Sequence, residues 1–489
     1  MIWALAGVSA LAAVPAGLRW LRVAQREHYL AGEVTRSAAR WRRAGVVNFA
    51  VELAGFAAMF AMILHDPRWG FAVALIAALW PIGLSVKGVT SPLAWTGRLR
   101  RLAVATTALL IVGLVLGASI DEPLVVVLPL FLLYAVVDIA SWLLTPYEKR
   151  HGGKWVEKAA AKIRSLDLDI VAITGSYGKT TTKNYVAHLL SGSRRVVASP
   201  ASFNNRMGLA RAVNEGLTPG TDVFVAEMGT YGPGEIADLT AWIPPKVAAM
   251  VAIGPVHLER FGGVEAIVRA KEEILDRAEV GVICVDDPLL GGVAVRRRQT
   301  MPIVEVSTSG GIVVAGETVL EAPPGVFPAN LAVALGICHA LGIDLEEVLG
   351  RVPDLPTAEH RQSVSVGAGG FTIVDDTFNS NPAGARSALA TLARVSPGGL
   401  TAVITPGMVE LGPVQDQENR VFAAEAAAQV DHLVIVGRTN RSALRHGSAN
   451  GGASVTVVDS REEAVAWARA NLGPRDAVLY ENDLPDHYP

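Results

Sequence analysis

The stretch Asp169-Ile-Val-Ala-Ile-Thr-Gly-Ser-Tyr-Gly-Lys-Thr-Thr-Thr182 decides the fold of the larger part of this chain. Its first six residues are an apolar run typical of a buried parallel strand, and a turn and a helix-compatible segment to about Leu190 follow. In such a turn backbone N–H groups and the helix dipole face a phosphate, Lys179 adds positive charge, and Thr180 offers a hydroxyl to Mg²⁺. The strict P-loop pattern requires a glycine where Ile173 stands. A tight turn that merely opens a helix would explain the glycines but not Gly-Lys-Thr-Thr after a strand, so we predict a nucleotide site.

Two further strands are expected to end beside this loop. Residues 222–229 form an apolar run that contains Glu227, and residues 246–254 form another that ends just before His257. Because parallel strands end at a common edge where α/β proteins bind ligands, Glu227 and His257 are candidate ligands of a divalent ion. Taken singly, Glu227 could be a strand-end cap and His257 a surface residue; their position beside a phosphate loop favours the site.

The C-terminal part repeats the alternation of strands and helices. Four apolar runs are expected to be strands, at residues 371–376, 400–405, 432–436 and 454–458. The pattern predicts a second doubly wound α/β unit, with a Rossmann-like arrangement, after a central unit built on a P-loop-type parallel sheet.

The N-terminal part has a different composition. The whole chain has 489 residues, 51% of them hydrophobic and 18% charged, with a formal net charge of −3. Residues 1–148 hold 12 Lys and Arg against 8 Asp and Glu, so that a slightly basic, apolar third precedes an acidic remainder. This composition excludes a disordered chain, a coiled coil and a disulfide-stapled peptide, and the negative net charge argues against nucleic-acid binding through a basic surface.

Five apolar stretches predict a helical membrane domain. Each is close to the roughly 20 residues that cross a bilayer as a helix, and they cover residues 2–18, 44–64, 70–86, 102–118 and 124–144. The basic connections alternate with nearly uncharged or acidic ones, which by the positive-inside rule places the N-terminus outside and residues 145–489 in the cytoplasm. We therefore expect a multi-pass protein of the cell membrane, and a buried soluble helical bundle is the alternative.

Two acids fall within these stretches. Glu52 lies in the second and Asp138 in the fifth. Unpaired carboxylates are unfavourable in lipid, so each acid could be part of a lipid-substrate or proton site. We favour the alternative that these acids are protonated or held by hydrogen bonds between helices, with Asp138 near the cytoplasmic end of its span.

Eight short motifs occur in an order that resembles a known family. They are Thr174-Gly-Ser-Tyr-Gly-Lys-Thr-Thr181, Asn204-Asn205-Arg206-Met-Gly208, Ala226-Glu227-Met-Gly229, Ile253-Gly-Pro-Val-His257, Ala270-Lys271-Glu272, His360-Arg361-Gln362, Asp375-Asp376-Thr-Phe-Asn379-Ser-Asn381-Pro382 and Gly407-Met-Val-Glu-Leu-Gly412. Together they resemble the Mur ligase superfamily, the ATP-dependent amide ligases of peptidoglycan synthesis, and most closely its D-alanyl-D-alanine-adding member. The likeness covers about residues 170–420.

The resemblance implies roles for particular residues. ATP contacts are implied for Gly175, Ser176, Gly178, Lys179, Thr180, Thr181, Asn330, Arg361, Asp375 and Asn379. Two magnesium ions are implied, with ligands Thr180, Glu227, His257 and a Lys271 that the family carbamylates. Lys179, His257 and Lys271 are the implied catalytic residues, and substrate contacts are implied for Asn204, Asn205 and Arg206.

The chain departs from the family pattern in three places. The soluble domain that grips the uridine-diphosphate sugar is missing, and the apolar stretches stand in its place. The adenine-side pattern is one residue shorter, at Phe327-Pro-Ala-Asn330, and the Lys-Gly-Ser near the C-terminus is replaced by Tyr480-Glu-Asn-Asp-Leu484. These departures affect the identity of the substrate more than the use of ATP.

The expected protein is thus a membrane-anchored ATP-dependent ligase that activates a carboxylate as an acyl phosphate and joins it to an amine such as D-alanyl-D-alanine. Its expected domains are 1–148, the membrane helices; 149–355, the ATP-binding unit; and 356–489, the C-terminal unit. The acceptor is either a soluble uridine-diphosphate-muramyl peptide or a lipid-linked one. An ATP-binding membrane sensor or scaffold without ligase turnover is the alternative from another class.

Overall fold

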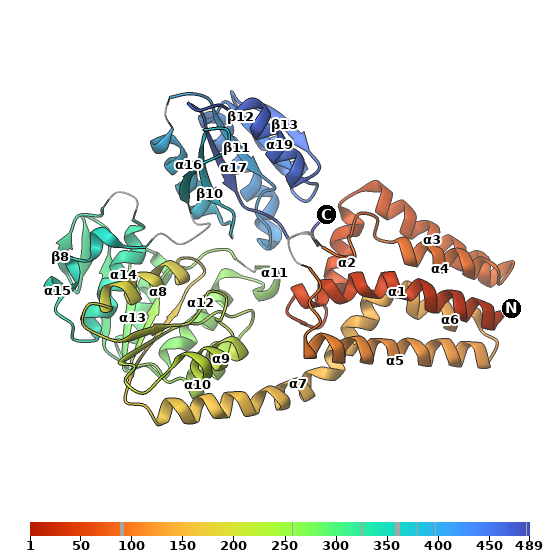
Figure 1. Ribbon diagram of the computed structural model, residues 1–489, viewed down its shortest axis with the longest axis horizontal. Coiled ribbons are helices and arrows are strands. Elements are labelled where there is room, and N and C mark those ends of the chain that lie inside the picture. The colour runs from red at the N-terminus through yellow and green to blue at the C-terminus, as the bar shows by residue number, and fades with distance from the viewer. Residues whose placement is uncertain are drawn as a thin grey trace.

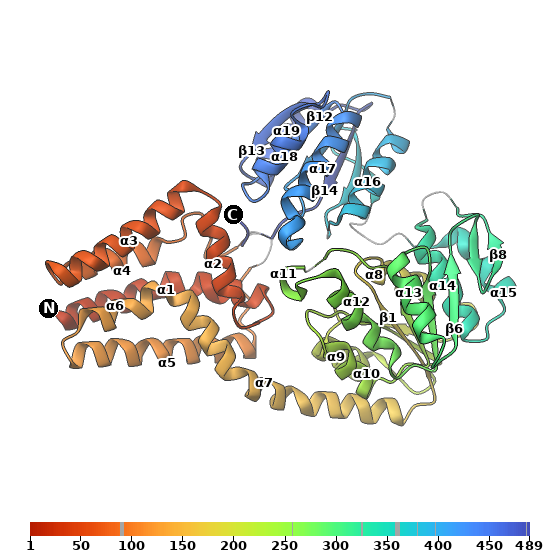
Figure 2. The ribbon, with the colours of Figure 1, turned by 180° about the vertical axis from the view of Figure 1, so that it is seen from behind.

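The computed structural model describes residues 1–88, 92–256, 258–323, 326–356, 362–378, 380–396, 398–485 and 487–489. A bundle of helices, a central α/β unit and a C-terminal α/β unit follow one another along the chain (Figure 1). The C-terminal unit stands above the gap between the other two, and the end of the chain returns to the helical bundle (Figures 1 and 2).

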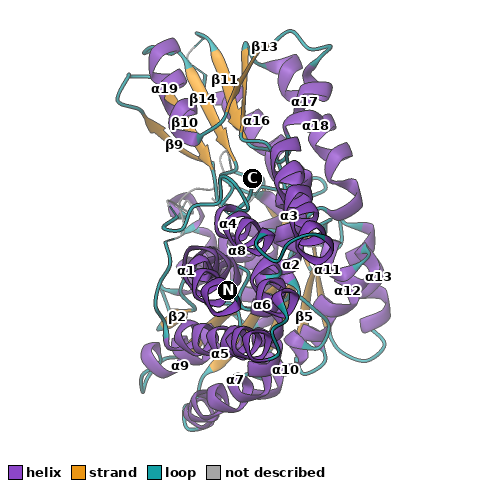
Figure 3. Ribbon diagram, turned by 90° about the vertical axis from the view of Figure 1, so that its right-hand side faces the viewer, coloured by secondary structure: helices purple, strands orange, loops and turns teal. Residues whose placement is uncertain are grey.

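The helical bundle contains six helices and the first half of a seventh. Their bounds are α1 Ile2–Arg26, α2 Glu33–Arg43, α3 Val46–Leu64, α4 Trp69–Leu79, α5 Gly97–Ser119, α6 Pro123–Phe131 and α7 Leu133–Arg164. Viewed from the side, these helices are seen nearly end on below the C-terminal sheet (Figure 3). The second half of α7 leaves the bundle and packs against the central unit, where Lys162 Nζ donates to the Asn214 carbonyl at 2.8 Å.

Of the five predicted spans, three are present as single apolar helices, the stretch 70–86 is not, and the stretch 124–144 is a bent pair of helices. Among the described residues only α1, α3 and α5 are long and apolar enough to cross a membrane singly, and α6 with α7 makes a fourth if that pair is counted as one span. Helix α4 has 11 residues because Pro81 and Gly83 interrupt the apolar run, and the pair α6 and α7 is bent by 76° just after Pro129. A proline ends or kinks a helix because it lacks an N–H group and clashes with the preceding turn.

Both acids of the predicted spans have partners inside the protein. The Asp138 carboxylate accepts hydrogen bonds from the Val34 and Thr35 backbone N–H groups, at 3.3 and 2.8 Å, and from the Thr35 hydroxyl at 2.6 Å. Asp138 therefore caps the N-terminus of α2, and Glu52 forms a two-pronged ion pair with Arg42. The favoured interpretation, hydrogen bonding between helices, is confirmed for both.

The central unit is an eight-stranded sheet with the order β2-β3-β1-β4-β5-β6-β7-β8. Its strands are β1 Asp169–Thr174, β2 Val196–Ala198, β3 Val223–Glu227, β4 Val247–Met250, β5 Val280–Cys284, β6 Ile303–Ser307, β7 Ile312–Val314 and β8 Glu317–Leu320. The first six strands in this order are parallel, and β7 and β8 pair antiparallel at one end.

Helices cover both faces of the central sheet. The larger helices are α8 Lys179–Leu190, α9 Arg206–Gly216, α10 Glu235–Trp242, α12 Val264–Glu272, α13 Pro288–Arg297 and α14 Pro328–Ala340, and the short ones are α11 Leu258–Phe261 and α15 Leu345–Leu349. One core lies between the sheet and α8 and α14, and the other lies between the sheet and α7, α9, α10, α12 and α13. Because residues on both sides are apolar, the strands read as continuous hydrophobic runs.

The C-terminal unit is a six-stranded sheet with the order β13-β12-β11-β14-β10-β9. Its strands are β9 Ser363–Val366, β10 Thr372–Asp376, β11 Thr401–Thr405, β12 His432–Val436, β13 Ser454–Val458 and β14 Ala477–Glu481. Helices α16 Pro382–Val395, α17 Gln415–Gln429 and α18 Arg441–Ser448 pack on one face, and α19 Arg461–Asn471 packs on the other. The predicted second doubly wound unit is present, and its four predicted strands lie within one residue of their expected limits.

Candidate active site

The phosphate loop lies between β1 and α8, as the sequence predicts. Gly178 has φ +76°, and a Cβ atom there would lie 2.8 Å from Asn330 Oδ1 and 2.9 Å from Val251 Cγ1, so the position requires glycine. The Ser176 hydroxyl and Gly254 are joined by hydrogen bonds of 3.1 Å. These contacts hold the loop against the end of the neighbouring strand β4.

Two lysines converge on this loop. Lys179 Nζ and Lys271 Nζ donate to the Gly175 carbonyl at 2.7 and 3.1 Å, although 92 residues of sequence separate them. Lys271 is only 3% exposed, and burial, with a smaller effect of the Lys179 charge, lowers its pKa well below the usual value. Burial thus favours the neutral form of this amine.

Glu227 is the buried carboxylate of the site. The Thr180 hydroxyl donates to its Oε2 at 2.9 Å and Asn204 Nδ2 donates to its Oε1 at 3.2 Å. Although burial alone would raise the pKa of Glu227, the Lys183 and Lys179 charges hold it below the ordinary value, so the group is an anion at neutral pH.

Lys183 was missed by the sequence analysis. Its Nζ lies 3.2 Å from Glu227 Oε2, and the side chain is 3% exposed. The signal is present in the sequence, because Lys183 follows Lys179 by four residues and so lies on the same face of α8.

The oxygen donors at this edge suit a magnesium ion. Thr180 and Glu227 present a hydroxyl and a carboxylate to the space beside the phosphate loop, and hard divalent cations prefer oxygen ligands. Within the described ranges, no three or more His, Cys, Asp or Glu side chains gather as a metal-binding group. His257, the predicted ligand of a second ion, lies outside the described residues, so the two-ion arrangement stays a prediction.

The three predicted substrate residues have different surroundings. Asn204 reaches Glu227, as described above, whereas Asn205 caps helix α9 by accepting from the Gly208 N–H at 3.0 Å. Arg206 is half exposed and pairs with Asp238 at 3.0 Å. Only Asn204 is thus brought to the phosphate loop.

The structure describes two of the four nucleotide contacts that are predicted outside the phosphate loop. Asn330, at the start of α14, donates to the Gly178 carbonyl at 3.3 Å and so lies against the phosphate loop. Asp375 accepts from the Thr377 N–H and hydroxyl at 3.1 and 2.6 Å in the turn after β10. Arg361 and Asn379 lie outside the described residues.

The segment Tyr480–Leu484, which departs from the family pattern, contains a buried acid. Glu481, at the end of β14, is 1% exposed and accepts a hydrogen bond from the Ser380 hydroxyl. Burial, together with the neighbouring Asp376, raises the pKa of Glu481 well above its usual value. Asn482 follows with φ +67°, the conformation that suits the glycine of the Lys-Gly-Ser pattern.

The phosphate loop carries a buried carboxylate and two lysines, and a second α/β unit follows it in the chain. This combination is typical of a nucleotide-dependent enzyme with two α/β domains. The chain belongs to the Mur ligase family. Residues 173–321 match the family model described as the Mur ligase middle domain, and residues 360–480 match that of the Mur ligase glutamate ligase domain.

Known relatives and solved structures agree with this assignment. The chain is 31% identical to the UDP-N-acetylmuramoyl-tripeptide–D-alanyl-D-alanine ligase of Mycobacterium leprae, over 67% of this chain and 73% of that protein. It is 28% identical to the ligase of the same name from Synechocystis sp., over 66% and 73%. In fold it is similar to MurF of Thermotoga maritima in complex with ADP, with a TM-score of 0.58 and 24% identity over 68% of this chain and 80% of that one. The chain is accordingly an acid–amine ligase of this family.

Proposed function

We propose that this protein is a membrane-anchored, ATP-dependent amide ligase that acts in the synthesis of peptidoglycan or a related cell-envelope precursor. It would activate a carboxylate as an acyl phosphate and join it to an amine such as D-alanyl-D-alanine. The observation that carries the proposal is the grouping of Lys179, Lys271, Thr180 and Glu227 around one phosphate loop. The names of the similar ligases support the choice of amine and of a muramyl peptide acceptor.

The protein's own groups account for the first step. Backbone N–H groups at the start of α8 and the Lys179 ammonium would hold the ATP phosphates, while the substrate carboxylate attacks the γ-phosphorus and ADP leaves. Thr180 and Glu227 would hold Mg²⁺, which supplies positive charge to the transferring phosphoryl group. The amine then attacks the acyl phosphate carbon and displaces inorganic phosphate.

The surroundings of Lys271 support its carbamylation. A carbamate forms when a neutral amine attacks carbon dioxide and loses a proton, and burial favours the neutral amine of Lys271. The product would bear a carboxylate-like oxygen pair beside Lys179 and, with His257, would serve a second metal ion. Lys271→Ala should abolish turnover, and added short carboxylic acids should restore part of it, while a Lys271→Ala protein with full activity would refute this role.

The C-terminal unit would complete the site by closing over the acyl phosphate. Asp375 lies at the carboxyl edge of the C-terminal sheet, and Arg361 and Asn379 are expected to act with it in bridging nucleotide and domain. Closure excludes water, which otherwise hydrolyses the intermediate.

The surface of the helical bundle supports a position in the cell membrane. Helix α3 exposes Phe49, Leu53, Phe56 and Phe60, and no more than 33% of the most apolar window of α1, α3 or α5 is buried within the protein. Such surfaces are unfavourable in water and ordinary in lipid. We propose a multi-pass protein whose ligase units face the cytoplasm, with the domain limits 1–148, 149–355 and 356–489.

The acceptor can be determined by measuring phosphate release from the detergent-purified protein with ATP, Mg²⁺ and D-alanyl-D-alanine. The soluble uridine-diphosphate-muramyl tripeptide and its lipid-linked form would be supplied separately, with Lys179→Ala as the inactive control. Turnover with the soluble form would mean that the helices serve only as an anchor. Turnover with the lipid-linked form alone would mean that the helices replace the missing substrate domain. Phosphate release that does not require an amine would contradict the ligase proposal and support an ATP-binding sensor.

A further inference from the structure

A cavity of about 350 Å³ lies where the helical bundle meets the C-terminal unit. It is bounded by the end of α2, by the loops after β11 and β12, and by Tyr488 of the returning chain end. Its size falls within the range of small-molecule sites, and the carboxyl ends of parallel strands are where α/β units bind ligands. None of the site residues predicted from the sequence lines it.

The wall from the helical bundle is cationic. Arg40 and Arg43 lie one turn apart on α2, and both line the cavity. Arg40 is held by Glu27 at 2.7 Å and stacks on the Tyr488 ring with 4.6 Å between the guanidinium carbon and the ring centroid. Arg43 is exposed, and in the part of the chain that the structure describes no ion pair or hydrogen bond engages its guanidinium.

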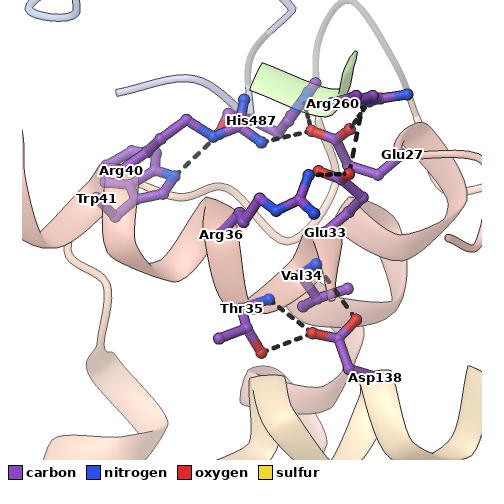
Figure 4. A network of polar contacts seen from close by, with 10 residues as sticks. All are labelled: Glu27, Glu33, Val34, Thr35, Arg36, Arg40, Trp41, Asp138, Arg260 and His487. Carbon is purple, nitrogen blue, oxygen red and sulfur yellow. Dashed lines mark hydrogen bonds and ion pairs between the residues drawn. The ribbon is translucent and has the colours of Figure 1, made fainter. Parts of the chain in front are cut away.

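A buried network of polar contacts fixes this wall in place (Figure 4). Glu27 at the end of α1 also accepts from Arg260 of the central unit at 3.0 Å and from His487 at 3.2 Å. The Trp41 indole N–H of α2 donates to the His487 carbonyl at 2.9 Å. Helix α2 is therefore docked on the ligase units, and Arg40 is held at the cavity.

The opposite wall is acidic and polar. Glu410 and Asp416 come from the loop after β11 and the start of α17, and Asp416 also pairs with Arg420 at 2.6 Å. Asn440 is fixed beside them, because its amide donates to the Pro406 and Met408 carbonyls at 3.0 Å. The Glu410 carbonyl accepts from the Leu258 N–H of the central unit at 3.1 Å, so the acidic wall adjoins the unit that carries the phosphate loop.

We propose that this cavity binds the amine substrate, a small amino acid or dipeptide with a free carboxylate, with Arg43 as the partner of that carboxylate. This inference rests on the proposed ligase function and assigns the helical bundle a part in substrate binding. The cationic wall fits the carboxylate, and the acidic wall, which adjoins the central unit, fits the ammonium end. A ligand with only negative charge, such as a phosphate headgroup, would be repelled by Glu410 and Asp416.

The test compares Arg43→Ala with the wild-type full-length protein in detergent. The KM for D-alanyl-D-alanine should rise about tenfold, as expected for a lost charge-assisted hydrogen bond, while the KM for ATP stays within about twofold. With D-alanyl-D-alaninamide, which lacks the carboxylate, wild type and variant should have equal KM values. Arg150→Ala is the matched control, since Arg150 is an exposed arginine of α7 that does not line the cavity, and it should behave as wild type.

The possible outcomes separate this inference from the ligase proposal. An unchanged KM for D-alanyl-D-alanine, or an equal loss with the amide, overturns the assignment of Arg43 while leaving the ligase proposal intact. If no amine supports turnover, the ligase proposal fails. Calorimetric titration with D-alanyl-D-alanine then still tests whether the cavity binds the dipeptide. Binding to wild type that Arg43→Ala weakens about tenfold supports the site, and the absence of binding to wild type overturns it.

Discussion

Glu27 is the side chain through which the helical bundle holds both ligase units, so Glu27→Gln should loosen that junction. The carboxylate is 5% exposed and bonds to Arg40, Arg260 and His487 at 2.7, 3.0 and 3.2 Å. Gln has nearly the same shape but no charge. In the network of Figure 4, the substitution leaves Arg260, which is 10% exposed, with the longer 3.5 Å contact to Glu33.

The free energy that the Glu27 carboxylate contributes to the junction follows from its pKa. Burial alone would raise this pKa, but the His487 hydrogen bond and the Arg40 charge hold it at about 2, against an ordinary value of 4.5. At 1.36 kcal/mol per pKa unit, the difference corresponds to about 3 kcal/mol of stabilisation of the docked carboxylate. Removing one partner of a buried ion pair costs about 3–5 kcal/mol, so the two arguments agree.

Hydrogen–deuterium exchange of the detergent-solubilised protein measures this loss directly. Backbone amides of α2, of α11 and of residues 487–489 should exchange about 100-fold faster in Glu27→Gln, because about 3 kcal/mol is roughly a factor of 10² in an opening equilibrium. Glu157→Gln, which changes an exposed glutamate of α7, is the control and should leave these amides unchanged. Exchange rates in Glu27→Gln within about threefold of wild type would refute the reasoning.

Acidification should reproduce the effect in the wild-type protein. Because the folded-state pKa of Glu27 lies below the ordinary one, its stabilisation is complete above about pH 4.5 and is lost as the pH falls towards 2. Between pH 4.5 and 3 the protection factors of the α2 amides, which correct the exchange rates for their intrinsic pH dependence, should fall in wild type but much less in Glu27→Gln. An equal fall of the protection factors in both proteins would mean that other carboxylates control the junction.

Three further predictions concern single residues. Lys179→Ala should abolish amine-dependent phosphate release, and wild-type activity in that variant would disprove the phosphate-loop assignment. Asp138→Ala removes the carboxylate that caps α2 and should destabilise the helical bundle by about 1–2 kcal/mol. A thermal scan should then give a Tm about 4 °C lower, and an unchanged Tm would show that the cap contributes nothing. Glu481→Gln should leave the Tm within about 2 °C of wild type, because burial and the neighbouring Asp376 raise the pKa of Glu481 and so favour the neutral form that Gln matches. Glu481→Lys should lower the Tm by more than about 5 °C, and a similar loss in the Gln variant would contradict this reasoning.

The phosphate loop could be predicted from the sequence because its parts are adjacent in the chain. A strand, two glycines and a helix beginning at Lys179 determine the local backbone, and the parallel order of β1, β3 and β4 brings Glu227 to the same edge. Lys183 lies one helical turn beyond the motif, where helical spacing places it on the same face as Lys179.

The helices of the apolar N-terminal region are predicted less well from sequence, and the reason is physical. Hydropathy measures transfer into lipid but not helix continuity, so it predicts a span over residues 70–86 although Pro81 and Gly83 lie within that run. The same applies to the bend after Pro129. Composition thus identified the apolar region correctly while misjudging how many of its segments are single straight helices.

The junction around Glu27 could not be predicted from local sequence, and it bears on what the helices do. Its contacts join residues 233 and 460 positions apart, and nothing near Glu27 in the chain indicates them. Glu27 bonds to Arg260 of the central unit and to His487 of the chain end that follows β14. A helical bundle that served only as an anchor would need no buried ion pairs with both parts of the chain. The network therefore favours a helical bundle that takes part in positioning the two ligase units.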